Sequence, residues 1–380
     1  MNRVVIKLDV LRHNFRVVNG WMKEHGSSWT LVTKVLCGHS DTLKALQHLG
    51  VESMGDSRLD NIRAIEKVVD NFEAWYLRLP HLSVISEVEE LAEVSLNSEI
   101  EIIEALNRQA KSRDRIHRIV VMIELGDLRE GVLPGSLVEF YNHVFQLDNI
   151  EVIGIGANLG CLSGAVPNLD QLTQLILYRE LLELKFQRKL PLISAGSSIM
   201  LPLLLQGRVP EAINHFRIGE SVFLGTDLVR GGALEGLRDD AIILEAEIAE
   251  IKEKSLTPLG DTSGMTPFEP VGESDFAPGK RGYRAVLTVG QLDTDVTGLT
   301  SMNPQYRIAG ASSDLTVVNI GERRDGLSIG DVIQFKVNYS ALLRLMAGKY
   351  VAKEVEPPLE EFFNIYKETD PPALPRVLEI

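Results

Sequence analysis

The chain has 380 residues, enough for two domains or for one large domain with an appendage. Hydrophobic residues make up 44% and charged residues 24%, which is ordinary for a water-soluble globular protein, and no apolar run approaches the length of a membrane span. The formal net charge of -14 would repel phosphate backbones, so we expect no nucleic-acid partner.

The two cysteines, Cys37 and Cys161, are too few for a disulfide framework and fit a reducing compartment. The N-terminal stretch MNRVVIKLDVLRHNF carries charges throughout and lacks the apolar core of a secretion signal. We therefore expect a cytoplasmic protein without a membrane segment.

Strand-like and helix-like segments alternate over the first part of the chain. After a strand at Arg3–Leu8 and a helix at Val10–His25, the expected strands are Trp29–Lys34, Glu52–Gly55, Trp75–Leu79, Glu93–Asn97, Arg118–Glu124, Glu151–Asn158, Leu190–Ala195 and Ile213–Ile218. Helical patterns separate them, for example at Asp41–Leu49, Ser98–Lys111, Leu137–Gln146 and Asp170–Lys189. Because parallel strands need helical crossovers, these eight units predict a (β/α)8 barrel of the TIM type over residues 1–228.

The pattern changes after about residue 228. Segments such as AIILEAEIAEI, RAVLTVGQL, LTVVNI and DVIQFKVNY are strand-like and are separated by turn-rich stretches, which predicts an all-β domain over residues 229–355. The strand at Arg3–Leu8 is a candidate member of that domain. The proline-containing end, residues 356–380, is interpreted as a C-terminal extension along the surface.

In a barrel of this type the active site lies at the C-terminal ends of the strands. The polar residues expected there are Lys34, Arg78, Asn97, Glu124, Asp127, Arg129, Glu130, Asn158, Ser197, Ser198 and Arg217. Each of them alone is interpreted as a capping or loop residue. Together they form a mouth rich in cations, which suits an anionic ligand with a phosphate and a carboxylate.

Lys34 is the natural reactive group of this mouth, because a desolvated lysine beside other cations has a lowered pKa and attacks aldehydes. Ser197-Ser198 and the Arg217–Glu220 stretch offer backbone N–H groups for a phosphate after the last two barrel strands. A phosphate-bearing aldehyde held by a lysine is pyridoxal phosphate (PLP). A Schiff-base aldolase would need a similar set of residues, so both interpretations, PLP binding and an aldolase, stay open from the residues alone.

Several motifs resemble one known family. IKLDVLRHNFR, TKVLCGHSD, IELGDLREG, GIGANLGC, SAGSS, RIGESVFLG, GASSDLTVV and VNYSALL are similar to successive motifs of the fold-type III PLP enzymes, specifically the alanine racemase superfamily. Within it the chain is most similar to ornithine racemase-like amino-acid racemases. The resemblance runs over nearly the whole chain, apart from residues 356–380.

The resemblance implies roles for individual residues. Lys34 would carry the cofactor covalently, Arg129 would face the substrate carboxylate or the cofactor's phenolate, and Arg217 would meet the pyridine nitrogen. The further cofactor-binding positions would be Asn158, Ser197, Ser198, Gly219, Glu220 and Tyr339. Asp314 would lie near the substrate, and the family builds each site from two subunits, which implies a homodimer.

Arg217 favours racemisation over decarboxylation. A carboxylate beside the pyridine nitrogen would keep that nitrogen protonated and make the ring a strong electron sink, whereas an arginine, itself always charged, disfavours the protonation of its neighbour. A weaker sink suits the removal and return of one proton, which is the chemistry of a racemase.

Racemisation needs a base on each face of the planar intermediate, and Lys34 is the base expected on one face. Alanine racemases use a tyrosine of the partner's β domain on the other, but the matching region EKSLTPLGDTSG has none, and no tyrosine occurs between Lys254 and Gly282. The candidates for the second base are Cys161, Tyr339, Asp293 and Asp295. A buried structural thiol is the alternative interpretation of Cys161.

Asp293 and Asp295 also raise a hypothesis about the substrate. Residues i and i+2 of an extended segment point to the same side, so both carboxylates could meet a cationic side chain such as that of ornithine or lysine. The alternative is an acidic turn, because aspartate is a common turn former. Two other functions stay open, a non-catalytic PLP-binding protein and a fold-type III lyase or dehydratase acting on D-amino acids. The lyase would need a late His/Cys metal pair, and no metal site is expected because no His follows His215 and no Cys follows Cys161.

Overall fold

The computed structural model describes residues 1–261, 263–264, 268, 277, 279–324 and 326–367. The chain forms two compact units. One consists of residues 11–34, 38–238 and 360–380, and we call it the barrel unit. The other consists of residues 1–10, 35–37 and 239–359, and we call it the β unit. We describe each by itself.

The barrel unit contains a closed barrel of parallel strands, which confirms the predicted fold class. Its strands follow one another in chain order: β2 (Ser28–Val32), β3 (Ser53–Asp56), β4 (Glu73–Tyr76), β5 (Val94–Asn97), β6 (His117–Met122), β7 (Ile150–Gly156), β8 (Leu192–Ser197) and β9 (His215–Ile218). The barrel closes where β9 pairs with β2, with Arg217 opposite Thr30. This closure brings the first and last barrel strands side by side.

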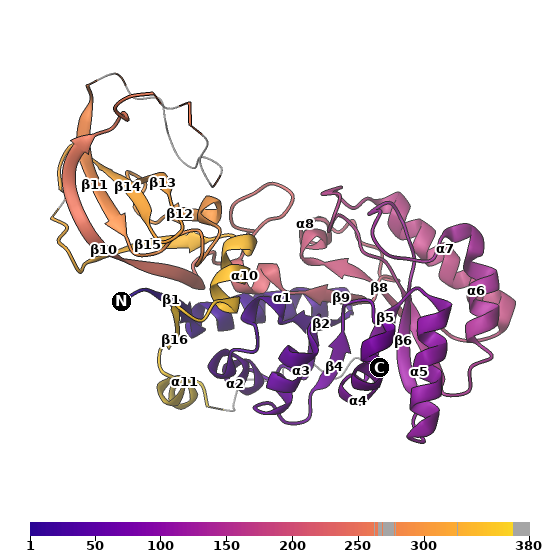
Figure 1. The fold of residues 1–380 in the computed structure, drawn as a ribbon. Helices are drawn as coiled ribbons and strands as arrows, with labels where there is room; N and C mark the ends of the chain where they lie inside the picture. Colours follow the sequence, from indigo (N-terminus) through magenta and orange to yellow (C-terminus); the bar gives the residue numbers. More distant parts are fainter. Residues whose placement is uncertain (262, 265–267, 269–276, 278, 325, 368–380) are drawn as a thin grey trace. The chain divides into compact units, whose positions relative to one another are not determined.

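Helices follow the strands and form the outer layer of the unit (Figure 1). They are α1 (Leu8–His25), α2 (Ser40–His48), α3 (Leu59–Glu66), α4 (Ile85–Leu91), α5 (Ile100–Ser112), α6 (Leu137–Val144), α7 (Leu169–Phe186), α8 (Leu201–Leu205) and α9 (Glu220–Leu224). Short 3-10 turns stand after some strands: η1 (Lys34–Leu36), η2 (Leu82–Val84), η3 (Pro134–Ser136) and η4 (Ser198–Met200). None of the helices in the described part of the chain is both long and apolar enough to cross a bilayer.

Large apolar side chains pack between neighbouring barrel strands. Trp75, Val94, Leu96, Val120, Met122, Ile153 and Leu192 form one buried cluster. Gly196 of β8 shows how tight the packing is, because a Cβ there would lie 1.8 Å from the ring of Phe216 on β9. A side chain at this position would displace the ring, so the SAGSS motif needs its glycine.

The β unit is built on an antiparallel sheet. The strands β10 (Ile242–Ser255), β11 (Arg281–Leu287), β12 (Leu299–Ser301), β13 (Arg307–Ala311), β14 (Thr316–Gly321) and β15 (Val332–Val337) lie in the order β12-β15-β10-β11-β14-β13. The first strand of the chain, β1 (Arg3–Lys7), pairs antiparallel with β10 and parallel with β16 (Ala352–Glu356). The N-terminal strand thus belongs to this sheet, and the unit resumes at Asp239 rather than at residue 229. A 3-10 turn, η5 (Val296–Gly298), and α10 (Tyr339–Ala347) complete it.

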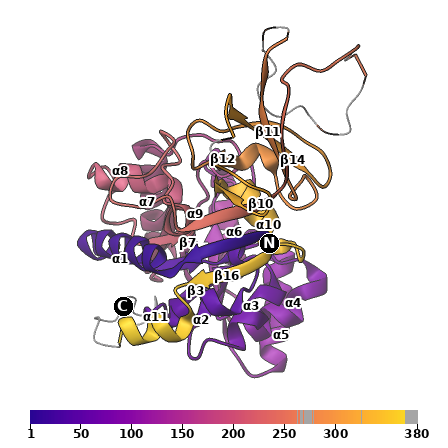
Figure 2. The ribbon, with the colours of Figure 1, turned by 90° about the vertical axis from the view of Figure 1, so that its left-hand side faces the viewer.

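The beginning of the C-terminal extension folds into a helix. In Figures 1 and 2, α11 (Leu359–Ile365) lies beside α2, and Phe362 is fully buried. The ring of Phe363 lies 4.6 Å from that of His48, and the guanidinium of Arg12 lies 3.9 Å from the ring of Tyr366. This part of the extension therefore packs into the barrel unit through aromatic contacts. Residues 368–380 lie outside the described residues.

Candidate active site

Lys34 stands two residues beyond the end of β2 rather than inside it. The strand ends at Val32, the Thr33 amide donates to the Gly55 carbonyl at 2.9 Å, and Lys34 begins η1. Lys34 is partly buried. The Thr33 hydroxyl donates to the carboxylate of Asp56, which is fully buried at the end of β3. Burial raises the pKa of Asp56, and its hydrogen bonds oppose that rise. The polypeptide that presents Lys34 is thus fixed to the neighbouring strand.

Arg217, at the end of β9, is fixed by hydrogen bonds at both terminal nitrogens. One nitrogen donates to the carbonyl oxygen of Ser194 at 2.7 Å and also to its hydroxyl. The other donates to the Ala157 carbonyl at 3.0 Å and to the Asn158 side chain at 2.9 Å. A guanidinium has five N–H groups, and these four hydrogen bonds use the four on its terminal nitrogens. The structure assigns the Nε–H no acceptor within the described residues, which leaves it for a ligand.

A second arginine is joined to this group through an acid. Glu130 accepts hydrogen bonds from Arg129 and from the side-chain amide of Asn158, which in turn holds Arg217. The ion pair with Glu130 raises the pKa of Arg129. Burial lowers the pKa of Arg217 to about 10, and the charge of Glu130 opposes that fall. The predicted residues Arg129, Asn158 and Arg217 therefore form one connected cluster, and Glu130 links them.

Cys161 lies next to Arg129. The thiol is exposed, and its interaction with the guanidinium is among the causes that raise the pKa of Arg129. Asp127 fixes the loop that contains Cys161, because its carboxylate accepts hydrogen bonds from the amides of Leu162 and Ser163. The interpretation of Cys161 as a buried structural thiol is wrong, because the residue is exposed. Its role as a base stays a prediction.

The residues predicted to bind a phosphate meet at the ends of β8 and β9. Ser197 ends β8, Ser198 begins η4, and the hydroxyl of Ser198 accepts from the Ser221 amide at 3.2 Å. Gly219 precedes α9, and a Cβ there would lie 2.6 Å from the Val32 carbonyl oxygen. Only a glycine allows this close approach to the end of β2, which brings the next residue, Glu220, towards Lys34.

Glu220 is a site residue whose side chain the sequence did not reveal, because only its backbone amide was expected to matter. Burial raises the pKa of its carboxyl to about 7, and the nearby charge of Lys34 opposes the rise. The carboxyl has no hydrogen bond that the structure describes. It is therefore an acid that changes its charge near neutral pH beside the expected cofactor lysine.

The remaining predicted residues belong to the β unit. Asp293 lies in a turn and accepts from the Gly290 amide at 3.0 Å. Asp295 caps η5, and it accepts from the amide of Thr297 and from the hydroxyl of Ser340. These bonds lower the pKa of Asp295. The premise that the two aspartates lie on an extended segment is therefore wrong, and local turn formation accounts for both. Their role towards a substrate stays a prediction.

Asp314 and Tyr339 are also described within the β unit. Asp314 accepts from the hydroxyl of Ser313 at 2.7 Å, and Tyr339 begins α10 behind the N-cap residue Asn338. Their roles towards cofactor and substrate stay predictions. In the stretch expected to carry the missing tyrosine, EKSLTPLGDTSG, residue 262 lies outside the described residues, as do residues 265–267, 269–276 and 278 of the wider range up to Gly282.

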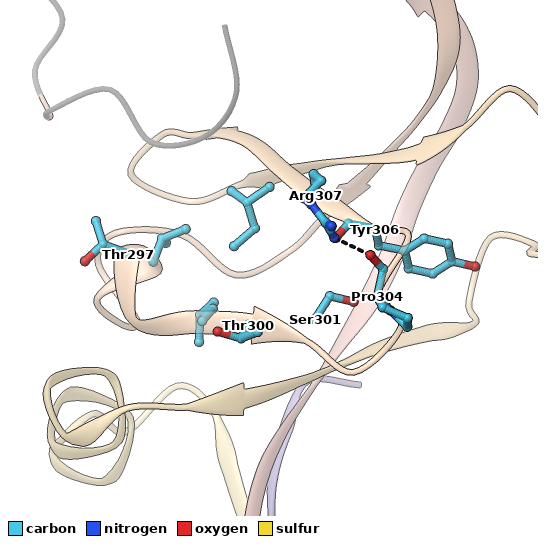
Figure 3. Close-up of a pocket in the computed structure, with 9 residues that line it drawn as sticks. Thr297, Thr300, Ser301, Pro304, Tyr306 and Arg307 are labelled. Carbon is cyan, nitrogen blue, oxygen red and sulfur yellow. Dashed lines mark hydrogen bonds between the residues drawn. The ribbon is translucent and has the colours of Figure 1, made fainter. Parts of the chain in front are cut away.

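The β unit also has a surface cavity of about 440 Å³. Figure 3 shows Thr297, Thr300, Ser301, Pro304, Tyr306 and Arg307 around it, with Arg307 donating to the Pro304 carbonyl. None of the predicted site residues lines this cavity.

Comparison with known proteins identifies the family. The family model described as alanine racemase, N-terminal domain, matches residues 6–227. The chain belongs to the alanine racemase family. The matched region begins in β1 and extends through all eight barrel strands to a point just beyond α9.

Two curated relatives are similar to this chain over nearly their whole length. The ornithine racemase of Acetoanaerobium sticklandii is 33% identical over 355 residues, which cover 93% of this chain and 99% of the relative. The lysine racemase of Thermotoga maritima is 31% identical over 355 residues, covering 93% and 98%.

Among solved structures, the alanine racemase of Bartonella henselae with covalently bound pyridoxal phosphate superposes with a TM-score of 0.68. It is 14% identical and covers 93% of this chain and 99% of its own. At this identity the likeness concerns the fold. PLP is the cofactor of the alanine racemase family, and the cluster around Lys34 and Arg217 provides donors that fit it.

Proposed function

We propose that this protein is a PLP-dependent amino-acid racemase that acts on a basic amino acid such as ornithine or lysine. The reaction type follows from membership of the alanine racemase family, and the basic substrate is supported by the ornithine and lysine racemases to which the chain is similar. The observation that carries the proposal is the state of Arg217, whose one remaining donor suits an unprotonated ring nitrogen.

The residues fit the cofactor by their donor chemistry. Lys34 supplies the amine for covalent attachment, and Arg217 offers its Nε–H to the pyridine nitrogen. Ser197, Ser198 and the amides of Gly219 and Glu220 would hold the phosphate, and Asn158 and Tyr339 would complete the binding set. Asn97 is buried at the end of β5, and its Oδ1 atom has no hydrogen-bond partner among the described residues, which provides a further acceptor at the same end of the barrel.

PLP, when bound, withdraws electrons and so acidifies the α-hydrogen of the amino acid joined to it. Lys34 Nζ would hold and return the proton on one face of the α-carbon. Arg129 would orient the substrate carboxylate, since its planar donor fork matches a carboxylate. Asp314 and the pair Asp293 and Asp295 would act on the substrate from the β unit. For the opposite face, Cys161 is the candidate that lies beside Arg129 in the barrel unit.

The decisive experiment incubates the purified protein and PLP with single L-amino acids in deuterated water, followed by chiral separation and mass spectrometry. We expect D-ornithine or D-lysine with deuterium at the α-carbon, and slower conversion of neutral amino acids. Lys34→Ala should abolish exchange, and borohydride reduction should fix the cofactor on Lys34. Bound cofactor without exchange of any amino acid would instead support a non-catalytic PLP-binding protein.

We further propose a cytoplasmic homodimer whose sites are shared between subunits. The low cysteine content supports the location, and the family supports the dimer. A complementation experiment tests the sharing. Inactive Lys34→Ala protein mixed with inactive Tyr339→Phe protein should regain activity, because some mixed dimers contain one intact site. If Lys34 and Tyr339 serve the same site from one chain, mixing restores nothing.

A further inference from the structure

A chain of buried side chains begins behind Arg217 and runs across the barrel interior. The Ser194 hydroxyl, which contacts Arg217, lies 2.7 Å from Nδ1 of His215, and Nε2 of His215 lies 3.2 Å from the Thr30 hydroxyl. Thr30 lies 2.8 Å from the hydroxyl of Ser53. These contacts connect four barrel strands, β8, β9, β2 and β3.

The chain ends on an acid. The Ser53 hydroxyl donates to Glu73 at 3.3 Å, and the indole N–H of Trp75 donates to the same carboxylate oxygen at 2.8 Å. The ring of Trp75 also stacks on that of His215, with centroids 4.6 Å apart. Glu73 is 3% exposed and His215 is 0% exposed. Water therefore cannot reach these side chains, so their polar atoms must find hydrogen-bond partners within the protein.

The chemistry of the two ends sets the direction of these hydrogen bonds. Arg217 can only donate, so the Ser194 oxygen accepts from it and is left with one hydrogen of its own. Giving that hydrogen to Nδ1 makes His215 donate from Nε2 to Thr30, and Thr30 then donates to Ser53. At the other end Trp75 can only donate, and an ionised Glu73 accepts from both Trp75 and Ser53. Only in this direction does each hydroxyl and ring hydrogen of the chain have an acceptor.

The reverse direction is less favourable. It would require Glu73 to be protonated and His215 to donate from Nδ1, which leaves the Ser194 hydrogen without an acceptor in this chain. An unused hydrogen bond in a dry site costs free energy. Burial and the charge of Arg217 both lower the pKa of His215, which keeps its ring neutral. Burial raises the pKa of Glu73, and the donations from Trp75 and Ser53 oppose the rise.

We propose that His215, held as the neutral Nε2–H tautomer, is a positioning residue that orients Arg217 through Ser194, in a one-way hydrogen-bond chain that ends on the carboxylate of Glu73. The consequence for the site is geometric. Because the Ser194 hydrogen is given to Nδ1 of His215, the hydroxyl is held in one orientation with its oxygen towards Arg217, so the guanidinium holds all four of its bonds and keeps its Nε–H available. This inference rests on the proposed racemase function only for its effect on catalysis.

The first test does not depend on activity. Ring nitrogen chemical shifts of the protein with 15N-labelled histidine should show His215 as the neutral Nε2–H tautomer at pH 6.5, where an ordinary histidine is half charged. The signal is assigned by its loss in His215→Gln. An Nδ1–H tautomer, or a ring that is charged at that pH, would overturn the proposed direction even if the protein proves not to be a racemase.

The second test compares two buried histidines of the same barrel. His117 is 3% exposed, and its ring lies 2.8 Å from the Ser95 hydroxyl, which also accepts from Asn97; within the described residues no hydrogen bond links this group to Arg217. In PLP-loaded protein, His215→Leu should shift the absorption spectrum of the cofactor in the same direction as Arg217→Gln and lower kcat at least about 10-fold, by analogy with groups that orient ligands in other sites. His117→Leu should leave the spectrum unchanged.

Two further variants test the link between His215 and Arg217. Glutamine can accept with Oε1 and donate with Nε2, so His215→Gln should recover most of the spectrum and of kcat. If His215→Leu fails to fold, Ser194→Ala removes the same link with a minimal change in volume and should produce the same spectral shift. Equal spectra for His215→Leu, or for Ser194→Ala, and for the wild type would overturn the positioning role.

Discussion

Glu220 provides the most direct test of the electrostatics of the site. Burial raises the pKa of its carboxyl from the ordinary 4.5 to about 7. At about 1.4 kcal/mol per pH unit, a shift of this size corresponds to roughly 3 kcal/mol of disfavoured ionisation. Because the side chain is only partly enclosed, solvent screening reduces the effect, and we expect about 1 to 2 kcal/mol. Glu220→Gln removes the charge and keeps the size.

The sign of the pH dependence follows from linkage. The folded protein binds this proton more tightly than the unfolded chain, so the contribution of Glu220 to stability is complete below pH 4.5 and is lost as the pH rises to about 7. The variant has no such loss. The melting temperature of cofactor-free Glu220→Gln should therefore rise relative to wild type between pH 4.5 and 7 and should change no further above that range.

The control is Glu211→Gln, since Glu211 is an exposed acid of the same unit. Its melting temperature relative to wild type should not vary across the same pH range. A side-chain carbon NMR titration of labelled glutamate, with Glu220 assigned through the variant, measures the pKa itself. A midpoint near 4.5 would refute the argument from burial, and so would a melting difference that does not change with pH.

Three further predictions follow from the same structure. Arg217→Lys keeps the charge but has only three donors, so it cannot retain four hydrogen bonds and still serve a ligand, and we expect kcat to fall at least about 10-fold with PLP absorbance retained. Burial lowers the pKa of His117 to about 4, so roughly 3 kcal/mol of stability present above pH 6.5 should be lost as the pH falls to 4, and acid melts of His117→Gln should lack this loss. If Cys161 is the second base, Cys161→Ala should stop α-deuterium exchange from one enantiomer while Lys34 continues to exchange the other; unchanged exchange of both enantiomers would exclude the thiol.

The barrel could be predicted because its signal is local. Each strand is a short apolar run followed by a helical pattern, and the number of such units determines the fold. The exact strand ends could not be predicted in this way. Lys34 was expected as the last residue of a strand, but β2 ends at Val32; the Thr33 amide still bonds to the Gly55 carbonyl of the neighbouring strand, and Lys34 begins the turn η1. A pairing of that kind depends on the register of two strands, which no single segment contains.

The groups behind the site were missed for the same reason. Ser194 and His215 stand opposite each other only because β8 pairs with β9, and Thr30 reaches His215 only because the barrel closes from β9 to β2. One sequence signal was available: His215 precedes Arg217 by two residues on a strand, so both side chains point to the same side. The helix α11 also had a signal, since Leu359, Phe362 and Phe363 are spaced for one helical face.

The arrangement of charge explains how an acidic chain can hold an anionic cofactor. The cation Arg129 pairs directly with Glu130, and Arg217 is connected to Glu130 through Asn158 and, in our proposal, to Glu73 through His215. These acids stand behind the arginines and fix them. Glu220 differs, because it lies beside Lys34 with a pKa of about 7 and no hydrogen bond within the described residues. A phosphate arriving at Ser198 and Gly219 would be repelled by its ionised form, so cofactor binding should favour the protonated form and should weaken as the pH rises above 7. Because neutral glutamine cannot ionise, Glu220→Gln should bind PLP with an affinity that no longer falls over that range.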